Sequence, residues 1–340
     1  MVASDRMELT SLELCAGAGG QALGVEQAGF SHLALVELDR HACETLRLNR
    51  PSWTVIQEDL RQFDAKPYRG VDLLAAGVPC PPFSVAGKQL GHRDERDLFP
   101  RVVEIARACE PKAIMVENVR GLLDPAFEDY REALAEAFES QGYEVYGWRL
   151  LHASDFGVPQ LRPRAVFVAL RSGLGVAFEW PCAFRTPPPS VGEALLPLMS
   201  SRGWRGANQW ARQADKIAPT LVGGSKKHGG PDLGPTRARR AWAALGVDGL
   251  ALADQPPGRD HQGMPRLTVA MAAVIQGFPA NWSFFGKKTP AYRQVGNAFP
   301  PPVAGAVAAS IRDSLLAEEK RAAGAPRRVR TPKQLSLGVA

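Results

Sequence analysis

The segment SLELCAGAGGQALGVEQAGFSHLALVEL, residues 11–38, contains a complete strand–helix–strand pattern. Residues 11–17 are typical of a strand, residues 21–28 of a helix that Gly29 ends, and residues 33–38 of a second strand. The turn between the first strand and the helix is rich in glycine, which lets a ligand approach the backbone. This unit predicts an α/β fold with strands that run parallel.

The alternation of strands and helices continues as far as residue 170. Two successive strand patterns near its end, residues 143–151 and 164–170, have no helix between them and predict an antiparallel hairpin. We therefore expect a doubly wound, mostly parallel sheet with an antiparallel hairpin at one edge. Further strands are predicted at 53–57, 71–77 and 112–118, and further helices at 41–49, 97–109 and 125–141.

Three consecutive prolines, Pro187 to Pro189, predict a stiff extended connector and a domain boundary. The following residues have weaker periodicity and more Gly, Trp, Arg and Lys, whereas residues 303–323 form a clear helical pattern. We expect one domain from residues 1–185 and 290–320, and a smaller irregular domain from residues 186–289. Residues 321–340 are expected to be a flexible basic tail.

The composition of the 340-residue chain, 45% of it hydrophobic, suits a large buried core. No apolar run approaches the roughly 20 residues that a membrane helix needs, and the N-terminus lacks a signal peptide pattern, so we expect a cytoplasmic protein. The five cysteines include no CxxC pair, which argues against a disulfide framework and against a metal site. Cys43 and Cys109, within predicted helices, are expected in the core.

Positive charge is concentrated in the second half of the chain. Residues 1–180 contain 19 Lys and Arg against 26 Asp and Glu, whereas residues 181–295 contain 15 against 6. A basic segment on an otherwise acidic protein suggests a polyanion such as nucleic acid as the partner, although a solvated basic surface has the same composition.

The glycine turn is followed by carboxylates at the ends of two further strands. Glu37 ends the second strand, where a carboxylate can bind ribose hydroxyls, and Asp59 ends the third. With Gly17 and Gly19, they predict a nucleoside-containing cofactor across the carboxyl ends of the strands. A packing turn and a dinucleotide-binding fold remain alternatives.

Cys80 follows an apolar strand and lies between Pro79 and Pro81, which restrict the backbone around it. This position is in the crevice where open α/β sheets carry their chemistry, so the thiol is a candidate nucleophile. Glu117 ends the next predicted strand, which should neighbour that of Cys80. Arg162 and Arg164 precede the last strand and are candidates for the same site.

At these residues the sequence resembles the cytosine-C5 DNA methyltransferases. The glycine turn with Glu37, the Pro-Cys loop, Glu117-Asn118-Val119, Gln160-x-Arg-x-Arg164, RLTVAMAAVIQGFP (266–279) and YRQVGNAFPPPVA (292–304) match that family's ordered motifs. The match spans residues 11–311 and implies the class I fold of enzymes that use S-adenosylmethionine. It also implies double-stranded DNA as the substrate.

The resemblance implies a mechanism in which Cys80 adds to C6 of cytosine and C5 then takes a methyl group from S-adenosylmethionine. Glu117 would contact N3 and the exocyclic amine, Arg162 would hold O2, and Arg164 would belong to the same site. The target base must leave the duplex to reach the thiol, and residues 83–97 would close over the DNA.

The resemblance also assigns binding residues. The cofactor would contact Cys15, Ala16, Gly17, Gly19, Gly20, Glu37, Leu38, Asp59, Leu60, Gly77 and Asn297. The DNA would contact Ser84, Lys88, Gln89, Arg93, Thr220, Lys226, Lys227, Arg237, Arg239 and Arg240. Trp204, Trp210 and Trp242 are expected in the core of the smaller domain.

By analogy with the family, we expect the protective methylase of a restriction-modification system, monomeric on DNA, with a cognate endonuclease that forms no stable complex with it. Three alternatives remain at this point. The same chemistry on tRNA differs only in substrate, a nicotinamide-dependent dehydrogenase would explain the glycine turn alone, and a non-catalytic DNA-binding protein would explain the charge alone.

Overall fold

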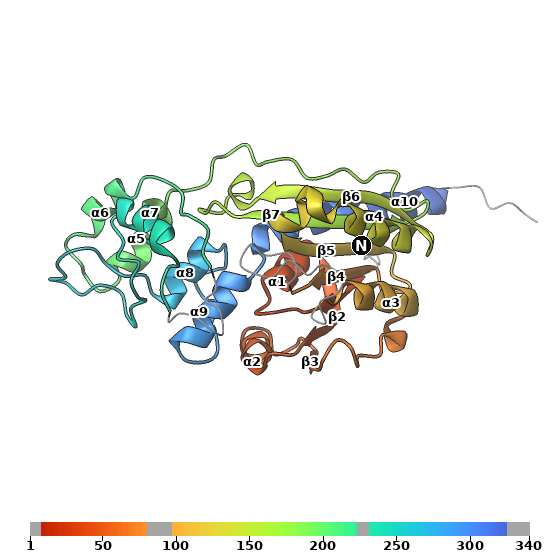
Figure 1. Ribbon diagram of the computed structural model, residues 1–340, viewed down its shortest axis with the longest axis horizontal. Coiled ribbons are helices and arrows are strands. Elements are labelled where there is room, and N and C mark those ends of the chain that lie inside the picture. The colour runs from red at the N-terminus through yellow and green to blue at the C-terminus, as the bar shows by residue number, and fades with distance from the viewer. Residues whose placement is uncertain (1–7, 80–96, 223–230, 325–340) are drawn as a thin grey trace, which may run out of the picture.

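The computed structural model describes residues 8–79, 97–222 and 231–324 (Figure 1). It contains a seven-stranded sheet in the order β3-β2-β1-β4-β5-β7-β6. Strands β1 to β5 are parallel, whereas β7 is antiparallel to both β5 and β6. The predicted, mostly parallel sheet with an antiparallel edge hairpin is therefore confirmed. The strands are β1 (Leu9–Leu14), β2 (Phe30–Glu37), β3 (Val55–Gln57), β4 (Leu73–Gly77), β5 (Ala113–Val119), β6 (Tyr143–His152) and β7 (Pro163–Arg171).

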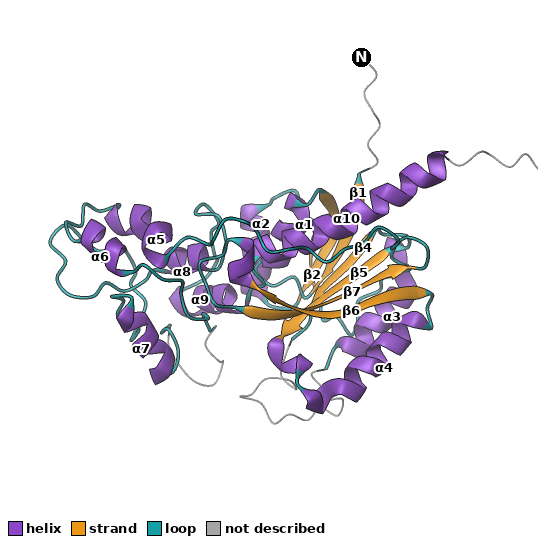
Figure 2. Ribbon diagram, turned by 90° about the horizontal axis from the view of Figure 1, so that it is seen from above, coloured by secondary structure: helices purple, strands orange, loops and turns teal. Residues whose placement is uncertain are grey.

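Helices cover both faces of the sheet (Figure 2). Helices α1 (Gly20–Gln27) and α10 (Pro301–Gly324) pack on one face, and α3 (Phe99–Cys109) and α4 (Glu128–Glu139) pack on the other. Helix α2 (Arg40–Asn49) lies next to β3. Because the central strands are covered on both sides, β4 and β5 consist of nearly continuous apolar residues rather than an alternating pattern.

The part of the chain between β7 and α10 packs beside the sheet (Figure 1). Residues 172–190 contain no helix or strand. The described residues that follow form five short helices: α5 (Val191–Ser200), α6 (Ala207–Gln213), α7 (Thr236–Ala244), α8 (Val269–Ile275) and α9 (Lys288–Asn297). Trp204, Trp210 and Trp242 lie in one buried cluster there, as predicted. The sequence analysis did not predict these helices of 7 to 10 residues, because their segment lacks the alternation with strand patterns that indicated the equally short α1 and α2.

Two further features bear on the predictions from sequence. Helix α10 continues to Gly324, a few residues into the predicted tail, and residues 325–340 lie outside the described residues. Within the described parts of the chain, no helix has the length and apolar character needed to cross a membrane.

Candidate active site

The carboxyl ends of β4 and β5 bring Gly77 and Glu117 together. The two residues are partners in the parallel register of these strands. A Cβ atom built on Gly77 would lie 3.9 Å from Glu117 Oε2, so the space beside the carboxylate is left open by the absence of a side chain there. Glu117 itself is 8% exposed. The sheet thus presents a nearly buried carboxylate at the edge where α/β enzymes bind their ligands.

Asn118 fixes the backbone that follows β4. Its Nδ2 donates to the carbonyl oxygen of Val78 at 3.3 Å, and its Oδ1 accepts from the amide of Val119 at 2.8 Å. Val78 and Pro79 are the last described residues before the predicted nucleophile, Cys80, which lies outside the described residues. The chain therefore leaves β4 next to Glu117 as it approaches the predicted thiol.

Arg164 forms an ion pair with Glu117. Its Nε lies 2.8 Å from Glu117 Oε1, and both side chains are about nine-tenths buried, at 11% and 10% exposure. Burial raises the pKa of Glu117, while the positive charges of Arg164 and then Arg162 oppose that rise. Glu117 is thus a buried carboxyl group whose charge is balanced by a neighbouring guanidinium.

Arg162 makes a different set of hydrogen bonds from Arg164, although only one residue separates the two. It is 1% exposed, and its guanidinium donates to the carbonyl oxygens of Leu221 at 2.7 Å, Gly296 at 2.7 Å and Ala298 at 3.0 Å. These acceptors belong to the segment after α6 and to the end of α9. The predicted contact of Arg162 with the base is not tested by these bonds and stays a prediction.

Two buried glutamines extend this set of hydrogen bonds. Gln160 Nε2 donates to Gln276 Oε1 at 2.8 Å, and Gln160 Oε1 accepts from the amide of Leu221 at 2.8 Å. Gln276 Nε2 donates to the carbonyl oxygen of Ala298. Gln276 was not predicted as a site residue, because its partner Gln160 is more than a hundred positions away along the chain.

The glycine turn is held by Glu37 at the end of β2. Glu37 Oε2 accepts from the amide of Gly17 and Oε1 from that of Asp39, both at 2.7 Å. Burial raises the pKa of Glu37, and these backbone hydrogen bonds oppose the rise. Gly17 has a φ of +55°, and a Cβ built on it would meet no atom within 4 Å. The turn therefore faces open space, as a site for a ligand against the backbone requires.

The other residues predicted to bind the cofactor differ in exposure. Leu38 is 61% exposed, whereas Leu60 is 4% exposed. Asp59 forms an ion pair with Arg61 at 3.0 Å, and the backbone hydrogen bond from Arg61 is the first cause of its lowered pKa. Asn297, the last residue of α9, is exposed. Their roles stay predictions.

Three of the described cysteines are poor nucleophiles because burial disfavours their thiolate forms. Burial raises the pKa of Cys43 and of Cys109 to about 12 and also raises that of Cys15, so these thiols stay protonated at neutral pH. Cys43 and Cys109 are fully buried, as predicted. Cys182 is exposed. In the parts of the chain that the structure describes, no group of three or more His, Cys, Asp or Glu could hold a metal ion.

The residues predicted to bind DNA are only partly described. Arg237 and Arg240 are exposed on α7, whereas Arg239 is half-buried and donates from Nε to the carbonyl oxygen of Gly234 at 2.8 Å. The hydroxyl of Thr220 donates to the carbonyl oxygen of Leu161, which ties it to the segment that carries Arg162. Ser84, Lys88, Gln89, Arg93, Lys226 and Lys227 lie outside the described residues.

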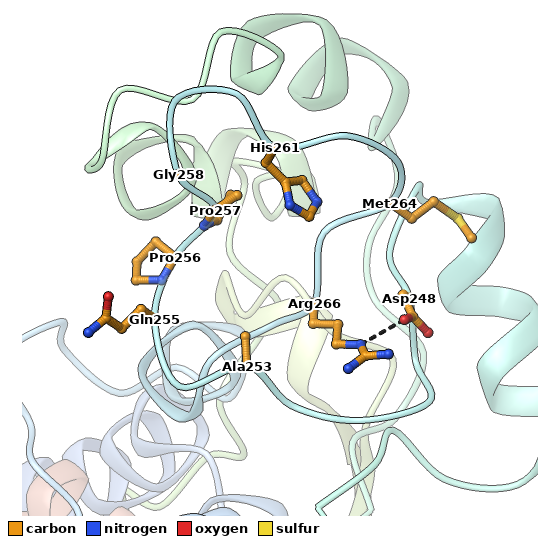
Figure 3. A pocket seen from close by; sticks show the side chains of 9 residues that line it. All are labelled: Asp248, Ala253, Gln255, Pro256, Pro257, Gly258, His261, Met264 and Arg266. Atoms are coloured by element: carbon orange, nitrogen blue, oxygen red, sulfur yellow. Dashed lines mark hydrogen bonds and ion pairs between the residues drawn. The ribbon is translucent and has the colours of Figure 1, made fainter.

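A separate pocket of about 400 Å³ is lined by residues within 248–266 of the connection between α7 and α8 (Figure 3). Asp248 and Arg266, which form an ion pair at 2.7 Å, lie on one side of it, and His261 and Met264 also line it. None of the residues predicted to contact the base, the cofactor or the DNA is among those that line this pocket. We therefore assign it no part in the reaction.

Comparison with known proteins identifies the family of this chain. The family model of the C-5 cytosine-specific DNA methylases matches residues 9–313. The chain belongs to this family. The type II methyltransferase M.NgoMIV of Neisseria gonorrhoeae is 55% identical over 92% of this chain and 100% of its own length. M.NaeI of Lentzea aerocolonigenes is 55% identical over 91% of this chain and 76% of its own length.

The fold agrees with this assignment. The crystal structure of Spodoptera frugiperda DNMT2 has a TM-score of 0.62 and 19% identity, and it covers 91% of this chain and 99% of that one. The chain is thus a DNA cytosine-5 methyltransferase with the class I methyltransferase fold, its substrate is DNA, and its family uses S-adenosylmethionine as the methyl donor. A dehydrogenase and a non-catalytic DNA-binding protein are no longer tenable.

Proposed function

We propose that the chain is the modification methyltransferase of a restriction-modification system and methylates one cytosine in a specific duplex sequence. The type II names of M.NgoMIV and M.NaeI, which match more than nine-tenths of the chain, support this proposal. The observation that carries the chemistry is the register of Gly77 with Glu117, since β4 leads directly to Cys80.

In this proposal the thiolate of Cys80 forms a bond to C6 of an extruded cytosine. The addition makes C5 electron-rich, so that C5 can take a methyl group, and loss of the C5 proton then allows the carbon–sulfur bond to break. S-adenosylmethionine, when bound, supplies the methyl group as an electrophile. Glu117 contacts N3 and the exocyclic amine. Its raised pKa favours the protonated carboxyl group, which can protonate the ring as negative charge develops there.

Arg162 and Arg164 have different proposed roles. Arg164 is paired with Glu117, so we propose that it orients the carboxylate and lies at the same edge of the base. Arg162 uses its guanidinium on three backbone carbonyls, and these bonds support a positioning part for it in addition to the predicted contact with O2. The charge-assisted bonds hold the segment with Arg164 against residues 296–298.

We propose that the cofactor lies along the turn from Cys15 to Gly20, with Glu37 at the ribose. The open space beside Gly17 and the inward-facing carboxylate of Glu37 fit a nucleoside ligand. Each carboxylate oxygen already accepts one backbone amide and has a second lone pair for a hydroxyl. Leu38, Asp59, Leu60, Gly77 and Asn297 are proposed to complete the site.

The remaining proposals concern the architecture and the partners. Residues 1–185 with 290–320 form the catalytic domain and residues 186–289 read the target, with Arg237 and Arg240 on the DNA. The enzyme acts as a monomer on the DNA of the nucleoid in the cytoplasm and forms no stable complex with a cognate endonuclease. The basic charge of residues 181–295 supports the DNA contacts.

Transfer of a tritiated methyl group to DNA and to tRNA in parallel tests the substrate. We expect incorporation into DNA alone, and equal labelling of tRNA would overturn the proposal. Bisulfite sequencing of the DNA of a host that expresses the chain should then show one modified cytosine in a fixed sequence context. Methylation without a fixed context would contradict the restriction-modification part.

A further inference from the structure

Trp282, in the segment between α8 and α9, reaches across to the glycine turn. Its indole Nε1 donates to the carbonyl oxygen of Ala18 at 3.2 Å, and its side chain is 4% exposed. Ala18 lies between Gly17 and Gly19 in the turn proposed to bind the cofactor. A residue 264 positions away in sequence thus fixes one carbonyl group of that turn.

The ring of Trp282 also fills the space behind Gly19. A Cβ atom on Gly19 would lie 3.0 Å from Trp282 Cζ2 and 2.7 Å from Leu46 Cδ2, and the φ of Gly19 is +86°. Any side chain at this position would displace the indole or the turn. The hydrogen bond and the close packing together restrict the glycine turn to a single position against Trp282.

The indole is in turn held from its other side. The guanidinium carbon of Arg50 lies 5.3 Å from the ring centroid of Trp282 and 5.7 Å from that of Trp53, distances at which a cation attracts an aromatic ring. Glu26 accepts from Arg50 Nη2 at 2.9 Å and from Trp53 Nε1 at 3.1 Å. Arg50, the residue that follows α2, therefore contacts the indole of Trp282 and is itself held by Glu26 of α1.

Backbone contacts anchor the same segment on α2. Asn49 exchanges two hydrogen bonds with the backbone of Ser283, at 2.7 and 2.8 Å, and the hydroxyl of Thr45 accepts from the amide of Phe285 at 2.8 Å. The position of Trp282 is thus fixed independently of the glycine turn. A brace of this kind can hold the turn in its ligand-binding shape before the ligand arrives.

We propose that Trp282 is a positioning residue for the cofactor, which holds the turn from Cys15 to Gly20 in the conformation that binds S-adenosylmethionine. This inference rests on the proposed location of the cofactor. Because the segment of Trp282 lies within the proposed target-reading domain, it also joins that domain to the cofactor site.

Substitution of tryptophan by phenylalanine provides a matched pair of variants. Trp282→Phe keeps an aromatic ring but removes the N–H donor to Ala18. Trp242→Phe makes the same change in the same buried cluster, where the indole N–H of Trp242 has no hydrogen-bond partner among the described residues. Calorimetric titration of the full chain with S-adenosylhomocysteine, the product of the reaction, gives the affinity without turnover.

We expect Trp282→Phe to raise the Kd for S-adenosylhomocysteine about fivefold, the factor that corresponds to ~1 kcal/mol for one hydrogen bond. The KM for S-adenosylmethionine should rise similarly, while kcat and the KM for DNA stay unchanged. Trp242→Phe should leave the Kd unchanged. If Trp282→Phe unfolds the chain, Arg50→Met, which removes the stacked cation, is measured in its place and should raise the Kd two- to threefold.

A Kd for Trp282→Phe within 1.5-fold of that of the parent overturns the inference, and so does an equal rise for Trp242→Phe, because the effect would then be one of core packing. The same limit of 1.5-fold applies to Arg50→Met where that variant is used. Absence of binding by the parent chain is a different result, since it would remove the proposed cofactor site itself.

Discussion

Gly77 and Glu117 are register partners on adjacent parallel strands, and the carboxylate of Glu117 faces the place where Gly77 has no side chain. Because the chain continues from the end of β4 through Val78 and Pro79 to Cys80, this pairing sets the buried acid beside the path of the chain toward the predicted nucleophile. The pairing connects the sheet topology with the chemistry.

Glu117→Gln should lower kcat by at least about a hundredfold, the range of a general acid or base. The amide keeps the shape of the side chain but can neither hold the exchangeable proton nor pair with Arg164. Single-turnover methylation of DNA measures the loss. Glu132→Gln, an exposed change on α4, is the control and should retain the parent rate. A rate for Glu117→Gln within threefold of the parent would contradict the role.

Arg162→Met should destabilise the fold more than Arg164→Met does. Arg162 donates to three backbone carbonyl groups, two of them in buried bonds, and each bond from a charged donor contributes ~1.5–3 kcal/mol. Urea denaturation followed by circular dichroism gives the free energies of unfolding. Arg164→Met should instead lower kcat with a smaller loss of stability. Equal stability losses would show that Arg162 has no special structural part.

Glu13→Gln should change how stability depends on pH. Burial raises the pKa of Glu13, which is fully buried on β1, to about 7, although Gln21 donates a hydrogen bond to it at 3.0 Å. The folded chain then holds a proton up to higher pH than the unfolded chain, so the free energy of unfolding falls as the pH rises from 4.5 to 7.

Glu13→Gln removes this titration, because its amide is neutral at every pH. At pH 8 the variant should exceed the parent in stability by up to roughly 3 kcal/mol, and near pH 4.5 the two should be similar. Urea denaturation at pH 4.5, 6 and 8 measures the difference. Parallel pH profiles for the parent and the variant would show that Glu13 does not titrate in this range.

Arg237→Gln combined with Arg240→Gln should weaken DNA binding mainly at low salt. If each exposed arginine contacts one phosphate, the slope of log K against log salt should decrease by roughly 1.8, since each contact contributes about 0.9. Arg69→Gln, far along the chain and paired with Glu110, is the control. Fluorescence anisotropy at several salt concentrations gives the slopes. An unchanged slope would place these arginines away from the DNA.

The sequence predicted the sheet because its information is local. Short stretches of sequence were enough to indicate the apolar strands, the helices that end at glycine and the absence of a helix before residue 164. These patterns sufficed to place Glu117 next to the strand of Cys80. The pairing of Glu117 with Arg164 follows from the antiparallel register of β5 and β7, in which Val119 is the partner of Arg164.

The contacts that the sequence could not predict join distant segments. Gln276 reaches Gln160 and Trp282 reaches Ala18 through packing that depends on the whole tertiary structure. The residues next to Gln276 do not indicate that its polar side chain is buried, and those next to Trp282 do not indicate that it supports the glycine turn. The different contacts of Arg162 and Arg164 were not predicted either, because the partners of Arg162, Leu221 and Gly296, lie in distant parts of the chain, whereas Arg164 pairs with Glu117 on the neighbouring strand.

Covalent trapping measures directly whether the sulfur of Cys80 bonds to C6 of the target base. In duplex DNA with 5-fluorocytosine in place of cytosine, fluorine cannot leave C5 as a proton does, so the adduct cannot resolve. With S-adenosylmethionine, the parent chain should form a complex that survives denaturing electrophoresis. Cys80→Ser should form none while binding the DNA with parental affinity. A trapped complex with Cys80→Ser, or none with a parent chain that methylates ordinary DNA, would contradict the account.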